Sequence, residues 1–411
     1  MTLTRFSLRR LLPLVLAAVA TIGATTAAGA MSPDERAKLD LSGYTVQHPG
    51  AGYFDLAARK AYVAATDDRL IRKEVEKLRR GVSCKQYLQA PPIKGDLLVP
   101  MLYRDPQGWK VAAKPFLDFE DAVSSLAAAQ FVAADATNGK CLLDVLGRWA
   151  KEGAFLDLKF ASQEGLQTWF QTEGSLLAAA LAYSIVRDQV PGANDQKKAI
   201  ENWLVAVAQH HLGRTIYSDD GSCCNNHFYR RAAYAAAIGV LVNDDTLFRF
   251  GMSAIYSALS EANPDGSLPR EMLRGQLAAR YQNYATMYLV FIAQIARMQG
   301  YDMFALNVNG RRLDDIVGMA IRMLKDPQLA AAQSGSGSQQ TDFSRQNQYL
   351  AWLAMLPGLD SHATGAADVV PADRPLYNRS LGGFLTLYFA PPPAKTSANA
   401  NSAKTPTKPQ G

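Results

Sequence analysis

Two stretches of the 411-residue chain contain residue types that can bind an acid group and move a proton. The first stretch, residues 223–231, reads CCNNHFYRR. We expect Asn225 or Asn226 to cap a helix, because an asparagine amide oxygen accepts a free backbone N–H at a helix start. His227 would then lie in the first turn, where the helix dipole favours a neutral imidazole and attracts an anion. A packed histidine beside a helix cap is the alternative.

The second stretch, residues 265–284, is a turn that leads into a helix with cations and tyrosines. Arg274 and Tyr281 are seven residues apart, so they share one face of a continuous helix. A guanidinium close to the phenol would lower the pKa of Tyr281. Arg280 and Glu271 have the ordinary alternative of being solvent-exposed charges.

Helical spacing of apolar and small residues continues from Asp118 almost to the end of the chain. Long helices joined by short loops predict stacked antiparallel helical hairpins, an all-α fold class. Alternating β–α patterning is absent, which argues against Rossmann and TIM-barrel architectures. The predicted helices are 119–135, 140–152, 163–189, 194–212, 226–242, 245–260, 275–299, 311–325 and 344–355.

The remaining segments have different patterns. Residues 31–55 read as coil, 56–80 as helix, and 383–389 as a short strand. Residues 86–116 lack helical periodicity and form either a functional lid or a surface connection. Five prolines interrupt this segment: Pro91, Pro92, Pro100, Pro106 and Pro115.

Both ends of the chain differ from its body in composition. Residues 1–30 have three arginines, an apolar run and a small-residue site at Ala28-Gly29-Ala30, the order of a signal peptide. An uncleaved anchor is the alternative. Residues 391–411 have three lysines and no core-forming residues, which predicts a disordered tail. The net charge of +6 therefore comes from the ends, and the body is formally neutral, which argues against nucleic-acid binding.

The four cysteines allow three disulfide pairings. Because a bond between the neighbours Cys223 and Cys224 would be strained, we expect one of them to pair with Cys84 or Cys141. A zinc site is the alternative, although the chain has no C-x-x-C pair.

Together the two stretches resemble polysaccharide lyase family 5, the alginate lyases that cleave polymannuronate. The family hallmarks are N-N-H before an aromatic position and L-P-x-E-x-x-R…Y-x-N. Here they stand at residues 225–229 and 268–283, and residues 379–389 look like the family's closing segment. The resemblance covers roughly residues 100–390. Two positions depart from it: Arg230 stands where members often have tryptophan, and Leu102 where a lid lysine is expected.

The resemblance implies an incomplete (α/α) toroid of helical hairpins around a central cleft, over residues 31–390 with its lid at 86–116. It places Asn226, His227, Arg274 and Tyr281 at the catalytic positions and implies neither metal nor organic cofactor. The implied partner is an acidic polysaccharide, with exopolysaccharide secretion machinery as a further candidate, in the periplasm or outside the cell. We expect substrate contacts from Tyr103, Arg104, Lys110, Trp169, Asn225, Tyr229 and Arg280.

The chemistry of a 4-linked uronate explains these residue types. Removal of the C5 proton builds negative charge on the neighbouring carboxylate, and the C4–O bond then breaks to leave an unsaturated end. The carboxylate needs neutralising groups, for which we assign Asn226 and Arg274, with His227 helping there or sharing the base role. Tyr281 is the expected base and acid, because C5–H and O4 of a mannuronate lie on the same face.

Two other functions fit the same composition. A helical-toroid glycoside hydrolase would need two carboxylates on either side of the bond, and no such motif is recognisable. A non-catalytic polysaccharide-binding protein of exopolysaccharide export would use aromatic side chains for stacking on sugars. No G-x-S-x-G sequence is present, which argues against a serine hydrolase.

Overall fold

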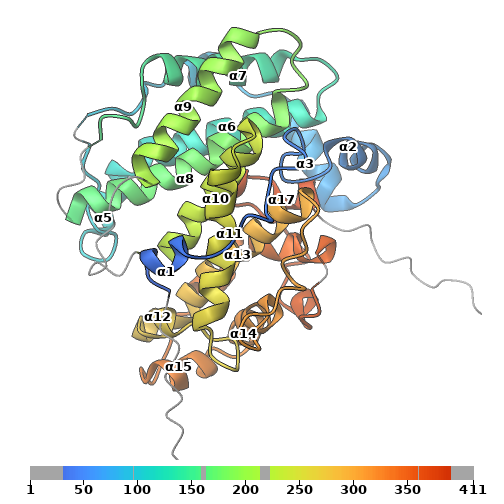
Figure 1. The fold of residues 1–411 in the computed structure, drawn as a ribbon. Helices are drawn as coiled ribbons and strands as arrows, with labels where there is room; N and C mark the ends of the chain where they lie inside the picture. The colour runs from blue at the N-terminus through green and yellow to red at the C-terminus, as the bar shows by residue number, and fades with distance from the viewer. Residues whose placement is uncertain (1–30, 96, 159–162, 213–222, 360, 390–411) are drawn as a thin grey trace, which may run out of the picture.

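The computed structural model describes residues 31–95, 97–158, 163–212, 223–359 and 361–389. The predicted signal peptide and the predicted tail lie outside these ranges. Within them the chain is built from helices and turns, with two isolated β-bridges (Figure 1). None of the helices described is both long and apolar enough to cross a bilayer. The α-helices are α1 (Pro33–Ala37), α2 (Leu56–Ala65), α3 (Arg69–Arg79), α4 (Cys84–Gln89), α5 (Pro106–Ala112), α6 (Lys114–Val132), α7 (Thr137–Lys151), α8 (Gln163–Val186), α9 (Asn194–Leu212), α10 (Asn226–Val242), α11 (Asp245–Glu261), α12 (Pro269–Met272), α13 (Ala278–Met298), α14 (Leu313–Lys325), α15 (Gln328–Ser334), α16 (Asn347–Leu350) and α17 (Leu385–Phe389).

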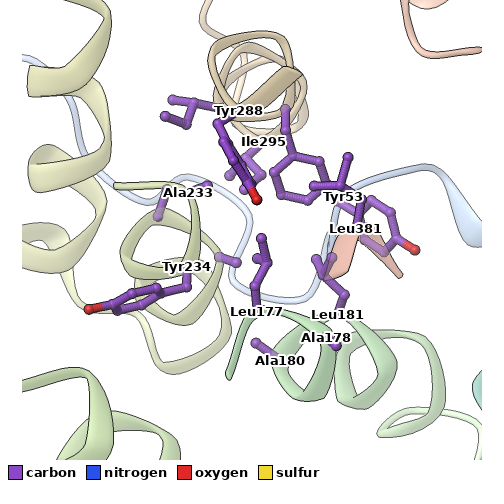
Figure 2. Close-up of a cluster of buried hydrophobic side chains, with 14 of the residues drawn as sticks. Tyr53, Leu177, Ala178, Ala180, Leu181, Ala233, Tyr234, Tyr288, Ile295 and Leu381 are labelled. Carbon is purple, nitrogen blue, oxygen red and sulfur yellow. The ribbon is translucent and has the colours of Figure 1, made fainter. Parts of the chain in front are cut away.

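Three long helices, α8, α10 and α13, meet at the centre of the molecule and hold the residues of interest. Figure 2 shows Leu177 of α8, Ala233 of α10 and Ile295 of α13 facing one another in the buried cluster, which Tyr53 and Leu381 close on one side. The contact faces of α8 and α10 are rich in alanine, and small side chains let helix backbones approach closely. Close packing of three helices fixes the positions of the side chains at their ends.

The hairpin of α10 and α11 illustrates how local sequence builds this framework. Asn225 caps α10, its side-chain oxygen accepting a hydrogen bond from the backbone N–H of His227 at 3.0 Å. Asn243 ends the helix in the left-handed conformation, with φ of 58°. A Cβ atom at Gly251 of α11 would lie 2.5 Å from the Cβ of Ala236, so glycine is needed where the two helices touch.

The segments at the two ends of the described chain brace this framework. Arg36 of α1 donates to the backbone oxygen of Cys223 at 3.0 Å and lies over the ring of Phe228, 3.9 Å from its centroid. Arg59 of α2 donates to the backbone oxygen of Leu387 in α17 at 2.7 Å. Both termini therefore hold elements that are distant in the sequence, α1 beside the start of α10 and α17 beside α2 and α3 (Figure 1).

Several predicted elements need correction. The helix expected over 56–80 is two helices, because Asp68 caps a new helix after Thr66 ends the first. The segment 86–116 contains α5, the start of α6 and most of α4, since Pro106 and Pro115 occupy first-turn positions where the missing N–H has no cost. The strand expected over 383–389 is helix α17 with one preceding β-bridge. Residues 344–355 form short helical turns instead of one helix.

The predicted disulfide pairing is wrong. Cys84 of α4 pairs with Cys141 of α7, across a Cα–Cα distance of 5.8 Å, and Cys223 pairs with its neighbour Cys224. Packing of α4 on α7 brings the first pair together, a tertiary contact with no local signal. All four cysteines are used in these bonds, which overturns the zinc alternative.

Candidate active site

A cavity of about 310 Å³ lies among α8, α10, α13 and residues 101–109. Among the described residues, the side chains that line it include three arginines and no carboxylate, an arrangement that attracts an anion. His227 and Tyr281, which come from different helices, line this one cavity together with Asn226 and Arg274. The full lining is Met101, Leu102, Tyr103, Trp109, Gln167, Phe170, Gln171, Asn226, His227, Arg230, Arg274, Arg280, Tyr281, Tyr284, Tyr288 and Tyr349.

Asn226 is held in place by a buried carboxylate. Oε1 of Glu271 accepts from the backbone N–H of Asn226 at 2.7 Å, and Oε2 accepts from its side-chain Nδ2 at 3.0 Å. The same Oε2 lies 4.0 Å from Nε of Arg274. Burial raises the pKa of Glu271 to about 7, although the hydrogen bonds from Asn226 and the charge of Arg274 oppose this shift. Glu271 is therefore not a solvent-exposed charge. It contacts both Asn226 and Arg274, the two residues assigned to the substrate carboxylate.

Tyr281 and Arg274 touch, but not through the continuous helix that the spacing predicts. Arg274 lies in a turn between α12 and the 3₁₀ turn Gly275–Leu277, and Tyr281 follows in α13. The guanidinium carbon is 4.7 Å from the centroid of the Tyr281 ring, over its face.

The expected lowering of the Tyr281 pKa is wrong. Burial raises the pKa of Tyr281, and the hydroxyl of Tyr103, 3.2 Å away, raises it further. The charge of Arg274 opposes the shift but does not overcome it, since the guanidinium lies over the ring face. The phenol is therefore protonated at neutral pH in the unliganded cavity.

His227 is packed between an aromatic ring and a cation. Its ring stacks on Phe170 with centroids 3.9 Å apart and planes at 12°. Its Nδ1 lies 3.4 Å from Nη2 of Arg230. Burial, followed by the charges of Arg230 and Arg274, lowers the pKa of His227 well below its ordinary value. The imidazole is therefore neutral at physiological pH, as the first-turn position on α10 suggests.

The residues expected to contact substrate fall into three groups. Tyr103 and Arg280 line the cavity. Arg104 and Lys110 are exposed beside it and do not belong to its lining. Trp169, Asn225 and Tyr229 are buried behind the wall, where Asn225 caps α10 and Tyr229 donates to Glu261 at 2.6 Å. These three support the wall, so we assign them no direct contact with substrate.

Sequence reasoning missed several lining residues. Gln167, Phe170 and Gln171 follow each other at helical spacing on one face of α8. Tyr284 and Tyr288 continue the Tyr281 face of α13 in the same way. This spacing is a usable signal, but the same pattern is typical of core positions, and only the tertiary arrangement shows that both faces border a cavity.

The chain is similar in sequence to known proteins. The sequence model described as alginate lyase matches residues 102–330. A protein named polysaccharide lyase from Stenotrophomonas maltophilia is 32% identical over 254 residues, which are 62% of this chain and 72% of that protein. An alginate lyase from Pseudomonas syringae pv. syringae is 30% identical over 260 residues, 61% of this chain and 65% of that protein.

Solved structures show the same fold. A histidine-to-alanine variant of alginate lyase A1-III, complexed with a tetrasaccharide, has a TM-score of 0.78 and 28% identity over 87% of this chain and 99% of that one. Another solved structure, of alginate lyase A1-III from Sphingomonas species A1, has a TM-score of 0.75 to this chain. The predicted all-α toroid is thereby confirmed. The chain belongs to the alginate lyase family and is a polysaccharide lyase, a carbon–oxygen lyase.

Proposed function

We propose that this lyase cleaves a 4-linked uronate polymer, with polymannuronate as the first candidate, by β-elimination at the cavity between α8, α10 and α13. One observation carries the proposal: Asn226, His227, Arg274 and Tyr281 line a single cavity, whose lining contains cations and no carboxylate in the part of the chain that the structure describes. A hydrolase would need two carboxylates at the bond. Glu271 and Glu173 are buried behind the wall and are absent from the lining.

In the proposed β-elimination, a single tyrosine acts first as the base and then as the acid. The phenol of Tyr281 first loses its proton to solvent, and the resulting phenolate takes the C5 proton. The electron pair of that C–H bond moves towards the carboxylate. Asn226 and Arg274 stabilise the charge that develops there. The C4–O bond then breaks to form the C4=C5 double bond, and Tyr281 returns its proton to the departing O4. The phenolate is regenerated, and no water is consumed.

Unsaturated ends absorb ultraviolet light and provide the direct assay. We expect the full chain to produce this absorbance from polymannuronate, and Tyr281→Phe and His227→Ala to fold normally but lose roughly 10²–10⁴-fold of the rate. Tyr256→Phe is a matched control, because Tyr256 is hydrogen-bonded to Tyr44 at 3.0 Å as Tyr281 is to Tyr103.

Three outcomes would contradict the proposal. New reducing ends without a double bond would identify a hydrolase. Polymer binding without unsaturated ends, across a panel of uronates, would identify a binding protein. Near-normal rates for both Tyr281→Phe and His227→Ala would remove these residues from the chemistry.

We also propose that the chain acts in the periplasm or outside the cell. The support is the composition of residues 1–30 and the pairing of all four cysteines in disulfides, which persist in oxidising compartments. N-terminal sequencing of the protein recovered from culture should show loss of residues 1–30, and an intact N-terminus in a cytoplasmic fraction would contradict it.

A further inference from the structure

Arg230 lines the cavity, but the proposed β-elimination assigns no role to its charge. It lies one turn after His227 on α10, so the two side chains share a face. Its Nε donates to Oε2 of Glu173 at 2.8 Å, and Glu173 of α8 is fully buried. This anchor fixes the orientation of the guanidinium, whose Nη2 lies 3.4 Å from Nδ1 of His227.

The chemistry of the two groups determines the direction of that contact. A guanidinium has only donors, whereas a neutral imidazole has one donor and one acceptor nitrogen. Nδ1 must therefore offer its lone pair to Arg230, and the ring proton then belongs to Nε2. The stack of Phe170 on the imidazole, with centroids 3.9 Å apart, opposes rotation of the ring to another orientation.

We propose that Arg230 is a positioning residue that holds His227 as the Nε2–H tautomer, so that the imidazole donates a hydrogen bond to the substrate carboxylate and accepts no proton from C5. This inference rests on the proposed function and deepens it. In this proposal the contact with Arg230 prevents His227 from sharing the base role, so Tyr281 alone is the base.

Among the described residues, the charged groups that lower the pKa of His227 are all cations. They are Arg230 and Arg231 on its own helix and Arg274 from the turn after α12. Glu173 pairs with both Arg230 and Arg231, its Oε1 lying 3.5 Å from Nη1 of Arg231. A second proton on the imidazole would therefore meet three positive groups, which opposes the imidazolium across the working pH range.

The test measures the tautomer in the unliganded full chain labelled with ¹⁵N-histidine. The chain has five histidines, and His227→Gln identifies the resonances of interest. We expect Nε2 to resonate as a protonated nitrogen and Nδ1 as an unprotonated one from pH 5 to 8. Arg230→Met should mix the tautomers, and Arg230→Lys, which retains a donor-only cation, should partly restore the single form.

Kinetics provide the second readout. Arg230→Met should lower kcat by the factor by which the Nε2–H fraction falls, roughly 2- to 10-fold for a mixture of tautomers, and should leave KM nearly unchanged. Glu173→Gln keeps an acceptor for Nε of Arg230 and should retain the tautomer. If Arg230→Met alone does not fold because Glu173 loses one of its two cationic partners, the double variant Glu173→Gln/Arg230→Met removes both charges and takes its place.

An Nδ1–H tautomer in the unsubstituted protein would overturn the proposal, as would an unchanged tautomer and kcat in Arg230→Met. The tautomer is read without substrate, so its outcome is independent of whether a uronate polymer is cleaved. A protein with the Nε2–H tautomer that produces no unsaturated ends would contradict the proposed function alone.

Discussion

The two walls of the cavity differ in how they are held. On the α10 wall, Asn226 and Arg230 are each bound to a carboxylate that is fully buried, Glu271 and Glu173. The wall that residues 98–111 contribute exposes large apolar groups to solvent: Tyr103, which lines the cavity, is 52% exposed, and Val111, just beyond the lining, is 75% exposed. The α10 wall is therefore held in place before substrate binds, whereas residues 98–111 have exposed apolar surface that substrate can bury.

This difference indicates that the two walls have different roles in the reaction. Groups that stabilise developing charge must be oriented in advance, because reorientation during the reaction costs free energy. Groups that surround a long polymer need access and can gain burial on binding. Substitutions in the buried wall should therefore change kcat, and substitutions in residues 98–111 should change KM.

Among changes to the residues that support the two walls, the largest effect should come from Glu271→Gln. In this variant an amide N–H₂ replaces one carboxylate oxygen and faces the N–H donor of Asn226, so the Asn226 side chain is no longer held in its orientation. Arg274 also loses its negatively charged neighbour. We expect kcat to fall roughly 10²–10³-fold with KM nearly unchanged. Steady-state rates of double-bond formation measure this. Glu74→Gln is the matched control, since Glu74 is 5% exposed on α3 and contacts α17, and an equal loss in both variants would contradict the special role of Glu271.

The pH dependence should be the next largest effect. Because burial and Tyr103 raise the pKa of Tyr281, only a small phenolate fraction exists at neutral pH, and it grows about tenfold per pH unit. We expect log kcat/KM to rise with pH from 6 to 9, with a slope near one above pH 7 and a steeper slope below it, where Glu271 with its pKa of about 7 also ionises. A profile that falls with rising pH would instead assign catalysis to a protonated group.

The smallest effect should come from Tyr103→Phe, which tests the exposed wall. The variant loses the hydrogen bond to the hydroxyl of Tyr281 at 3.2 Å but keeps the ring. One such bond corresponds to about 1 kcal/mol, but its loss also lets the pKa of Tyr281 fall, which increases the phenolate fraction. The two effects oppose each other, so we expect kcat/KM to decrease by less than about 10-fold, mainly through KM. A loss as large as that of Tyr281→Phe would mean that Tyr103 takes part in proton transfer and that the two walls do not divide the work.

The predictable parts of the fold are those determined locally. The bounds of α10 follow from Asn225 and Asn243, whose cap conformations need no distant contact. The disulfides and helix α17 were mispredicted, because α4 meets α7, and α17 meets α3, only after the chain has folded. A short apolar run is equally compatible with strand and helix until its neighbours are known.

The same division applies to the site. The motifs place Asn226, His227, Arg274 and Tyr281 in one cavity, because each sits near the start of a helix or in a turn with a local signature. The supporting Glu173 and the raised pKa of Tyr281 depend on burial, which no spacing reveals. Arg230 is visible in the sequence as a departure from the family, but its contact with His227 appears only in three dimensions.

In the proposed complex, one sugar acid group is held by the α10 wall while the phenol of α13 reaches its C5. A crystal structure of Tyr281→Phe bound to a mannuronate tetrasaccharide tests this most directly. We predict the carboxylate of one sugar within hydrogen-bonding distance of Asn226 and Arg274, and its C5 against the ring edge of residue 281. An oligosaccharide bound elsewhere, or one whose carboxylate faces away from α10, would contradict the account.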